Sequence, residues 1–331
     1  MASSLNRRKF LSCLRAGTAS FAIAPLALAE EKGQKFVKTT FTYKKVGRLE
    51  MKADVFRPND DNVRPVVLWI HGGALIMGSR SEVDGRVMKR ALHAGYTLVS
   101  IDYRLAPETK LPEIIEDVED AYAWVHKQGP KLFRADRRKI AVLGGSAGGY
   151  LTLTCGFRAK PRPAALVSFW GYGDLIGDWY SKPSEFYRKQ PRVSKEKAFR
   201  GVDGPPVADG TRNPKRRHDF YLFCRQNGLW PKLVAGFDPQ TQSKAFAPYM
   251  PVRNVTNSYH PTMIHGAADT DVPYEQSVLM QKQFQQHEVP HKFITVENAG
   301  HGLSDADPKV VSRMYDQVFA FVHHYFEKQL D

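Results

Sequence analysis

The sequence is poor in cysteine and contains no apolar run long enough to cross a membrane. Only three cysteines occur among its 331 residues, and Cys13 lies near the N-terminus. We expect the other two, Cys155 and Cys224, to be buried free thiols, because they fall in distant parts of the predicted fold. The uncharged run 16–29 has 14 residues, fewer than the ~20 that a spanning helix needs. We therefore predict no stable membrane anchor.

Acidic residues are also scarce relative to basic ones. Lys and Arg number 48 and Asp and Glu 34, which gives a net charge of +14. Such an excess attracts anionic surfaces but names no partner. The chain has neither an RNA-binding signature of aromatic residues and glycine nor zinc-finger spacing, so we predict no nucleic-acid partner. A hydrophobic fraction of 42% is enough for a sizeable core.

The first 29 residues are typical of a targeting segment. Arg7 and Arg8 precede an apolar stretch that ends in Ala-Leu-Ala at 27–29, a cleavage pattern. The segment resembles a twin-arginine export signal, and we expect cleavage before Glu30. Removing its four basic residues leaves a mature net charge of +10. The mature protein is predicted to be periplasmic or secreted.

Apolar runs alternate with helical patterns through most of the chain. Residues 36–57 alternate polar and apolar, as antiparallel edge strands do. The continuous apolar runs are typical of strands buried on both faces, and they lie at 65–70, 96–101, 140–143, 164–170, 261–265 and 292–296. Amphipathic patterns predict helices at 111–128 and 310–329. We predict an α/β fold with a mostly parallel sheet covered by helices on both faces.

One long segment interrupts this alternation. Residues 171–258 contain no comparable apolar run and are dense in aromatic and basic residues. Because crossover connections are normally short, we interpret the segment as a cap inserted between the sixth and seventh core strands. The catalytic domain would then consist of residues 30–170 and 259–331. A disordered loop is the alternative, although the aromatic residues could form a small core.

A nucleophile is predicted at Ser146. Residues 144–149 read Gly-Gly-Ser-Ala-Gly-Gly, which satisfies G-x-S-x-G, follows a predicted strand and precedes a helix-compatible run. A serine on such a sharp turn needs small neighbours and a base within hydrogen-bond reach. A simple glycine-rich turn is the alternative for the motif alone.

The predicted base and acid follow later strands, in the order serine, acid, histidine. His301 lies in a loop of small residues after the last strand, and imidazole titrates near neutral pH. Asp269 follows the preceding strand and would orient that imidazole. Asp271, two residues further on, is the alternative acid.

An oxyanion hole is predicted from the loop after the first buried strand. His71-Gly72-Gly73-Ala74 matches the loop that donates a backbone N–H to the tetrahedral intermediate. We expect the N–H groups of Gly72, Gly73 and Ala147 to serve as donors. We also expect substrate contacts from His71, Ala74, Trp170 and Tyr172.

At these motifs the sequence resembles the hormone-sensitive-lipase-like branch of the α/β-hydrolases, which includes bacterial acetyl- and feruloyl-esterase-type enzymes. The matching segments span most of the chain and are 71–73, 102–108, 144–149, 265–273 and 300–302. The resemblance implies an α/β-hydrolase fold, an acyl-enzyme mechanism, no cofactor and no metal. It also implies a structural, salt-bridged role for residues 102–108. Ala74 replaces the third glycine usual in that branch, which leaves open the question of which backbone N–H of the loop points at the oxyanion.

The resemblance favours hydrolysis of carboxylic esters. A serine peptidase similar to the catalytic domain of the prolyl-oligopeptidase family is the alternative, although residues 30–65 are too short for its propeller. A non-catalytic binding protein is a third class, which the intact set of serine, aspartate and histidine disfavours. The basic and aromatic cap suits an acyl or aryl ester on a carbohydrate, including an anionic one. A solvated basic face over a small ester pocket is the alternative.

Overall fold

A single eight-stranded sheet organises the structure, a computed structural model that describes residues 36–260, 262–267 and 269–329. Its strands are β1 (Phe36–Val46), β2 (Leu49–Pro58), β3 (Arg64–Ile70), β4 (Thr97–Ile101), β5 (Ala135–Gly145), β6 (Ala165–Phe169), β7 (Thr262–Ala267) and β8 (His291–Val296). They lie in the order β1-β2-β4-β3-β5-β6-β7-β8.

The sheet is parallel except at one edge. β1 pairs antiparallel with β2, and β2 antiparallel with β4, whereas all the later pairs are parallel. The antiparallel edge strands and the parallel sheet that the sequence predicts are therefore confirmed. β5 is longer than its apolar run, because it begins at Ala135, which pairs with Arg64 of β3; a register shift separates this pair from the regular pairing that starts at Ile140.

Helices cover both faces of the sheet, as predicted. The longer ones are α1 (Gly85–His93), α2 (Leu111–Phe133), α3 (Ala147–Arg158), α7 (Pro214–Asn227), α8 (Glu275–Gln286) and α9 (Pro308–Glu327). α2 runs past its predicted end and continues through Pro130 to Arg134, whose left-handed backbone ends the helix. The sequence patterns do not single out α1 or α8.

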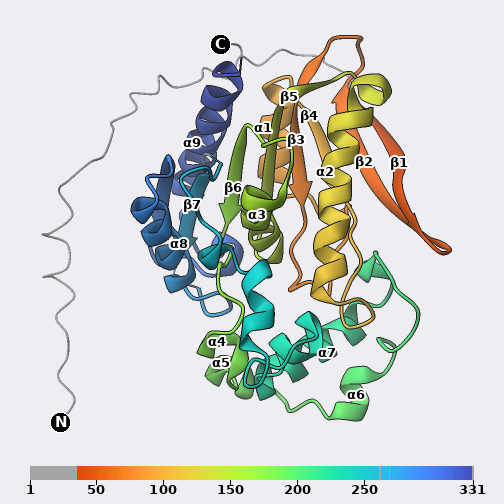
Figure 1. Ribbon diagram of the computed structural model, residues 1–331, viewed down its shortest axis with the longest axis vertical. Helices are drawn as coiled ribbons and strands as arrows, with labels where there is room; N and C mark the ends of the chain where they lie inside the picture. The colour runs from red at the N-terminus through yellow and green to blue at the C-terminus, as the bar shows by residue number, and fades with distance from the viewer. Residues whose placement is uncertain (1–35, 261, 268, 330–331) are drawn as a thin grey trace, which may run out of the picture.

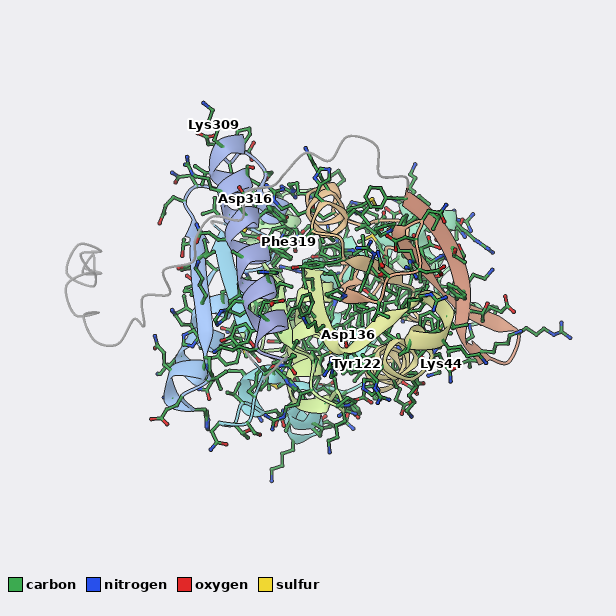
Figure 2. The ribbon with its side chains drawn as sticks, turned by 90° about the horizontal axis from the view of Figure 1, so that it is seen from above. Lys44, Tyr122, Asp136, Lys309, Asp316 and Phe319 are labelled. Atoms are coloured by element: carbon green, nitrogen blue, oxygen red, sulfur yellow. The ribbon has the colours of Figure 1, made fainter. Side chains whose placement is uncertain are left out.

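Alternate residues of the central strands point to two separate cores. In β3, Val66 and Leu68 join the core under α2 and α3, whereas Val67 and Trp69 join the core under α1 and α9. Figure 2 labels one residue from each core, Tyr122 on α2 and Phe319 on α9. The sheet is thus buried on both faces, which explains the continuous apolar runs.

The segment between β6 and β7 folds as short helices at one end of the sheet (Figure 1). Besides α7 it contains α4 (Asp178–Ser181), α5 (Glu185–Arg188), α6 (Lys195–Phe199) and the short helical turns η2 (Gly210–Arg212), η3 (Pro231–Ala235), η4 (Ser243–Tyr249) and η5 (Pro251–Arg253). Phe220, Trp230 and Phe246 are fully buried and join the same core as α2 and α3. Aromatic packing therefore orders this segment, and the disordered-loop alternative is wrong.

Three expectations from the sequence concern the N-terminal segment, a membrane span and the two cysteines. The predicted export signal lies outside the described residues. No helix within the described ranges is long and apolar enough to cross a bilayer. Cys155 and Cys224 are both buried and unpaired, as expected, and burial raises the pKa of the Cys155 thiol to about 12.

Candidate active site

Ser146 occupies a strained turn between β5 and α3. Its backbone angles are φ 57° and ψ −122°, a region that non-glycine residues rarely adopt. The Ser146 N–H donates to the Phe169 carbonyl at 2.9 Å, which anchors the turn to β6. Strain of this kind persists only where surrounding structure enforces it and is common at active sites.

Glycines make this turn sterically feasible. A Cβ on Gly148 would lie 2.0 Å from the Ile70 carbonyl oxygen, and one on Gly144 would lie 2.4 Å from the Gly148 oxygen. Helix α3 can therefore approach β3 closely only because these positions lack side chains. The requirement for small neighbours that the motif predicts has a direct structural basis.

His301 and Asp269 form a hydrogen-bonded pair. The loops after β8 and β7 carry them, and His301 Nδ1 lies 2.5 Å from Asp269 Oδ2. The same carboxylate accepts the N–H groups of Asp271 and Val272 through its other oxygen, at 2.6 and 2.9 Å. These three hydrogen bonds therefore fix the orientation of the Asp269 carboxylate.

The electrostatics of the pair favour a protonated imidazole. Burial lowers the pKa of His301, but the hydrogen bond with Asp269 and the charges of Asp271 and Asp269 together raise it by more than burial lowers it. The net effect is a pKa above the ordinary value of 6.5. A base with this property accepts a proton from a neighbouring hydroxyl more readily.

Asp271, the alternative acid, lies on the opposite side of the imidazole. Its Oδ2 is 3.7 Å from His301 Nε2, whereas Asp269 binds Nδ1. Tyr221 and Arg225 of α7 both donate to Asp271 Oδ1. The two carboxylates therefore have different neighbours, and the geometry of an orienting acid belongs to Asp269.

The loop after β3 brings backbone N–H groups to the serine. The Gly72 Cα lies so close that a Cβ there would be 3.3 Å from the Ser146 Cβ. Gly73 has φ +99°, and its carbonyl accepts the N–H groups of Ile76 and Met77 in a tight turn. Within the described part of the chain, no hydrogen bond engages the N–H groups of Gly73 or Ala147. Both remain available to an oxyanion.

Neighbouring segments hold this loop rigid. Ala74, which replaces the usual third glycine, adopts φ 56°, and its carbonyl accepts the indole N–H of Trp230 at 3.0 Å. The Tyr103 hydroxyl donates to the carbonyls of His71 and Gly72 at 3.0 and 3.2 Å. Trp230, from the segment between β6 and β7, thus fixes the loop after β3.

An open pocket of about 460 Å³ contains Ser146 and His301. Of the four predicted substrate contacts, Ala74 and Trp170 line it. His71 and Tyr172 do not, because both are fully buried and stack on Tyr103 and Tyr150. The expectation that these two residues contact the substrate is therefore corrected: their rings pack in the interior and do not line the pocket.

His71 is a packing residue in its neutral form. Its Nδ1 lies 2.8 Å from the Gly72 carbonyl, so that nitrogen carries the proton. Burial lowers the pKa of His71 to about 4, which keeps the imidazole uncharged at neutral pH.

The pocket also contains residues that no sequence motif indicates. They are Trp69 of β3, Met77, Glu82, Val83 and Asp84 of the loop between β3 and α1, and Tyr221 of α7; Asp271, the alternative acid, lines the pocket as well. All of the charged side chains that line it, apart from the histidine, are carboxylates. Only the folded arrangement of the cap and the loop before α1 brings them together, so the sequence alone gives no signal for them.

The basic residues of the cap lie elsewhere. Arg217 and Arg225 are buried and paired with Glu108 and Asp271, and Arg212 lines a second pocket. Lys215 and Arg216 are exposed. None of these cations lines the described pocket that contains the serine, so an anionic substrate has no cationic partner from this set there.

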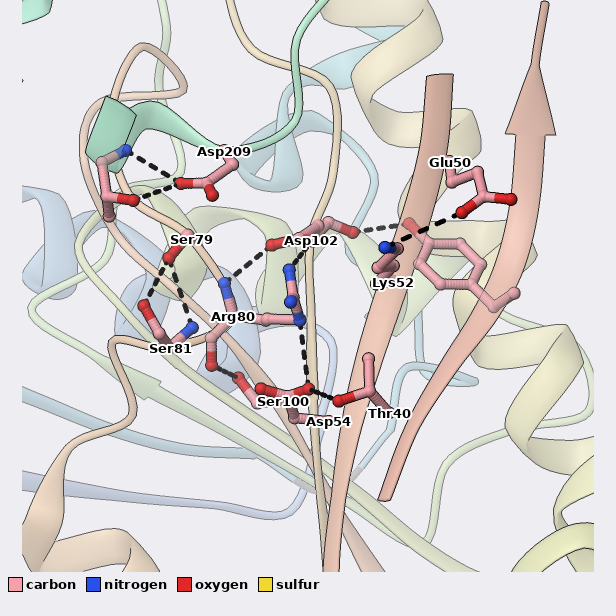
Figure 3. Close-up of polar contacts among 12 residues, drawn as sticks. Thr40, Glu50, Lys52, Asp54, Ser79, Arg80, Ser81, Ser100, Asp102 and Asp209 are labelled. Carbon is pink, nitrogen blue, oxygen red and sulfur yellow. Dashed lines mark hydrogen bonds and ion pairs between the residues drawn. The ribbon is translucent and has the colours of Figure 1, made fainter. Parts of the chain in front are cut away.

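Residues 102–108 are structural, as the resemblance implies. Figure 3 shows Arg80 between Asp54 and Asp102, at 3.1 and 2.6 Å. Arg104 binds Asp117 at 2.7 Å, and the 770 Å³ pocket beside this network does not include the serine. These ion pairs brace the loop that follows β3.

No group of three or more metal-binding side chains gathers among the residues that the structure describes. The described residues thus offer no set of metal ligands. The expectation of no cofactor and no metal stays a prediction.

Curated relatives match the chain over a small part of their own length. The non-reducing polyketide synthase adrD of Penicillium rubens is 29% identical in an alignment 287 positions long, which covers 72% of this chain and 11% of that protein. The synthase trt4 of Aspergillus terreus is 35% identical in an alignment 180 positions long, which covers 50% of this chain and 7% of that protein. The chain thus spans about a tenth of the length of these relatives.

Solved structures share the fold over nearly all of the chain. An esterase from Pyrobaculum calidifontis is 26% identical, with a TM-score of 0.61, and the match covers 87% of this chain and 85% of that one. An α/β-hydrolase superfamily protein from Enterococcus faecalis is 22% identical, with a TM-score of 0.64 and coverage of 86% and 98%.

The sheet order, the turn at Ser146 and these likenesses define an α/β-hydrolase of the esterase type. The model of the BD-FAE family matches residues 53–284, more than half of the sequence. The chain belongs to the BD-FAE family.

Proposed function

We propose that the protein hydrolyses carboxylic esters through an acyl-enzyme, with Ser146, His301 and Asp269 as its catalytic triad. One observation carries the proposal: Ser146 and His301 line the same pocket, and the His301 Nδ1 is bound to Asp269 at 2.5 Å. Because Asp269 engages Nδ1, Nε2 is the ring nitrogen left to act as a base on the serine hydroxyl.

The residues divide the reaction among themselves. His301 Nε2 takes the proton of the Ser146 hydroxyl as the oxygen attacks the ester carbonyl. The N–H groups of Gly73 and Ala147 stabilise the tetrahedral oxyanion, and Gly72 places the loop beside the serine. The imidazolium then gives its proton to the departing alcohol. In the second half of the reaction, water gives a proton to His301 and attacks the acyl carbonyl, and Ser146 leaves with that proton. Asp269 holds the tautomer throughout and takes no proton.

The substrates we propose are small acyl or aryl esters, including those carried by carbohydrates. The pocket of about 460 Å³ lies at the lower end of the size range of small-molecule sites and is bordered by Trp69, Trp170 and Tyr221. Aromatic walls suit an aryl group or the face of a sugar ring. Because the charged lining groups other than the histidine are carboxylates, a neutral ester fits better than an anionic one.

The test uses Ser146→Ala and a panel of substrates. We expect short p-nitrophenyl esters to be hydrolysed, with acetylated xylan and feruloyl esters separating the acyl preferences, and a peptide p-nitroanilide to be poor. Ser146→Ala should lower kcat by about 10⁴-fold or more, as loss of a nucleophile does in other triads. Ser258→Ala, an exposed serine in a loop, is the matched control and should leave the rate unchanged.

Two outcomes would contradict the proposal. A folded Ser146→Ala protein that hydrolyses esters near the wild-type rate would remove the nucleophile. A preference for the peptide amide over every ester would favour the peptidase alternative.

A further inference from the structure

The imidazole of His301 lies between two carboxylates. Asp269 Oδ2 is 2.5 Å from Nδ1, and Asp271 Oδ2 is 3.7 Å from Nε2. Nε2 is the nitrogen that must reach the serine hydroxyl, and no hydrogen bond joins it to Ser146 Oγ in this structure. In the resting protein the charge of Asp271 therefore faces the working side of the base.

Two cap residues fix the Asp271 carboxylate. The Tyr221 hydroxyl donates to Oδ1, and Arg225 Nη1 donates to the same oxygen at 2.7 Å. Arg225 Nη2 also donates to the Asp271 carbonyl, at 3.1 Å. These bonds occupy Oδ1 and leave Oδ2 directed toward His301.

Arg225 itself is immobilised by aromatic rings. Its side chain is only 3% exposed, and its guanidinium lies 4.8–5.7 Å from the centroids of Trp179, Tyr180, Tyr187 and Tyr221. A buried cation among electron-rich ring faces is stabilised in place. The cap thus supplies a rigid support for a carboxylate that belongs to the catalytic domain.

Several charged and polar groups surround the imidazole of His301. Asp269 and Asp271 reach it from the loop after β7, and Arg225 and Tyr221 from α7. Glu82 and Asp84, from the loop before α1, line the same pocket. Asp305 lies on the same loop as His301 and is exposed.

We propose that Asp271 is a positioning residue that holds the imidazole of His301 from its Nε2 side, and that Tyr221 and Arg225 of the cap set the position of its carboxylate. The inference rests on the proposed ester hydrolysis. When Nε2 takes the proton of Ser146, the imidazolium has a carboxylate on each side, which stabilises it. Asp271 takes no proton, and the proton still leaves on the alcohol.

The pH dependence of kcat/KM tests this role. The acid limb reports the pKa of the free base. Since the Asp271 charge raises the pKa of His301, Asp271→Asn should lower that pKa and move the acid limb to lower pH. The activity ratio of variant to wild type should be at least about threefold higher at pH 5 than at pH 8, which is a shift of about half a pH unit or more. Asp271→Glu keeps the charge and should restore the wild-type limb.

The cap contribution is tested separately with Tyr221→Phe. This variant removes one of the donors that fix the carboxylate, so Asp271 is held less firmly toward Nε2 and the acid limb should move to lower pH, in the same direction as in Asp271→Asn but by less. Asp305→Asn is the control that removes an exposed carboxylate near the histidine in sequence, and it should not shift the limb. Thermal unfolding of each variant verifies folding.

The outcomes separate this inference from the proposed function. A folded Asp271→Asn protein with an unshifted acid limb overturns the positioning role while Ser146→Ala remains inactive. An unshifted or upward-shifted acid limb in Tyr221→Phe overturns the role of the cap. If Ser146→Ala retains activity, ester hydrolysis through this serine fails first.

Discussion

At the scale of single residues, the site combines one strained position with several satisfied ones. Ser146 has a backbone conformation that a glycine would adopt without cost, yet a serine stands there. Asp269, by contrast, has three polar partners. The strain is therefore concentrated on the residue that we assign as nucleophile.

This strain leads to a prediction for Ser146→Gly. Both Ser146→Gly and Ser146→Ala should abolish hydrolysis, but only glycine relaxes the backbone at φ 57°. We expect the glycine variant to be more stable than the alanine variant by about 1 kcal/mol. Urea unfolding followed by circular dichroism measures the difference, and equal stabilities would show that the turn is not strained.

The sequence predicts some of these residues and not others, for physical reasons. Ser146, Asp269 and His301 each follow a strand and stand in loops with distinctive small neighbours, so their positions are visible in the sequence. Asp271 was visible only as an alternative acid. Its partner Arg225 lies 46 positions away, in a helix whose pairing depends on how the cap packs.

At the scale of elements, strands were predictable because burial on both faces leaves continuous apolar runs. β5 extends beyond its run because Ala135 pairs with Arg64 of β3 ahead of a register shift, so a backbone pairing and not an apolar run sets where the strand begins. The cap lacks such a code. Its elements are mostly short, and aromatic side chains such as Trp230 order them by tertiary packing.

Helix α7 ties the cap to the loop after β3 through one buried arginine. Arg217 donates to the carbonyls of Ile76 and Ala106, at 2.9 and 3.1 Å, and to Glu108 at 2.6 Å. Burial raises the pKa of Glu108 while the arginine charge opposes this rise. The buried Glu108 carboxylate therefore depends on Arg217 to stabilise its charge.

We predict that Arg217→Met destabilises the protein by about 3–5 kcal/mol, because it leaves the buried Glu108 and two carbonyls without their donor. Activity should fall as well, since the same contacts support the oxyanion loop. Arg216→Met is the matched control, because Arg216 is exposed on the same helix, and it should change stability by less than about 0.5 kcal/mol. Similar losses in both variants would contradict the account.

At the scale of the whole molecule, the carboxyl ends of β3, β5, β7 and β8 lie at the same end of the sheet, and the cap lies over that end (Figure 1). Parallel strands place their carboxyl ends together, so residues far apart in the chain meet there. The cap supplies Trp230, Arg217 and Tyr221 to this edge. It is therefore part of the site and not only a cover.

The central claim is that Ser146 is a nucleophile activated by His301 and Asp269. The most direct measurement is covalent labelling with a fluorophosphonate, followed by mass spectrometry of the intact protein and its peptides. We predict one adduct per chain, located on Ser146, with labelling slowed by orders of magnitude in His301→Ala and Asp269→Asn. An adduct on another residue, or none in a preparation that still hydrolyses esters, would contradict the claim.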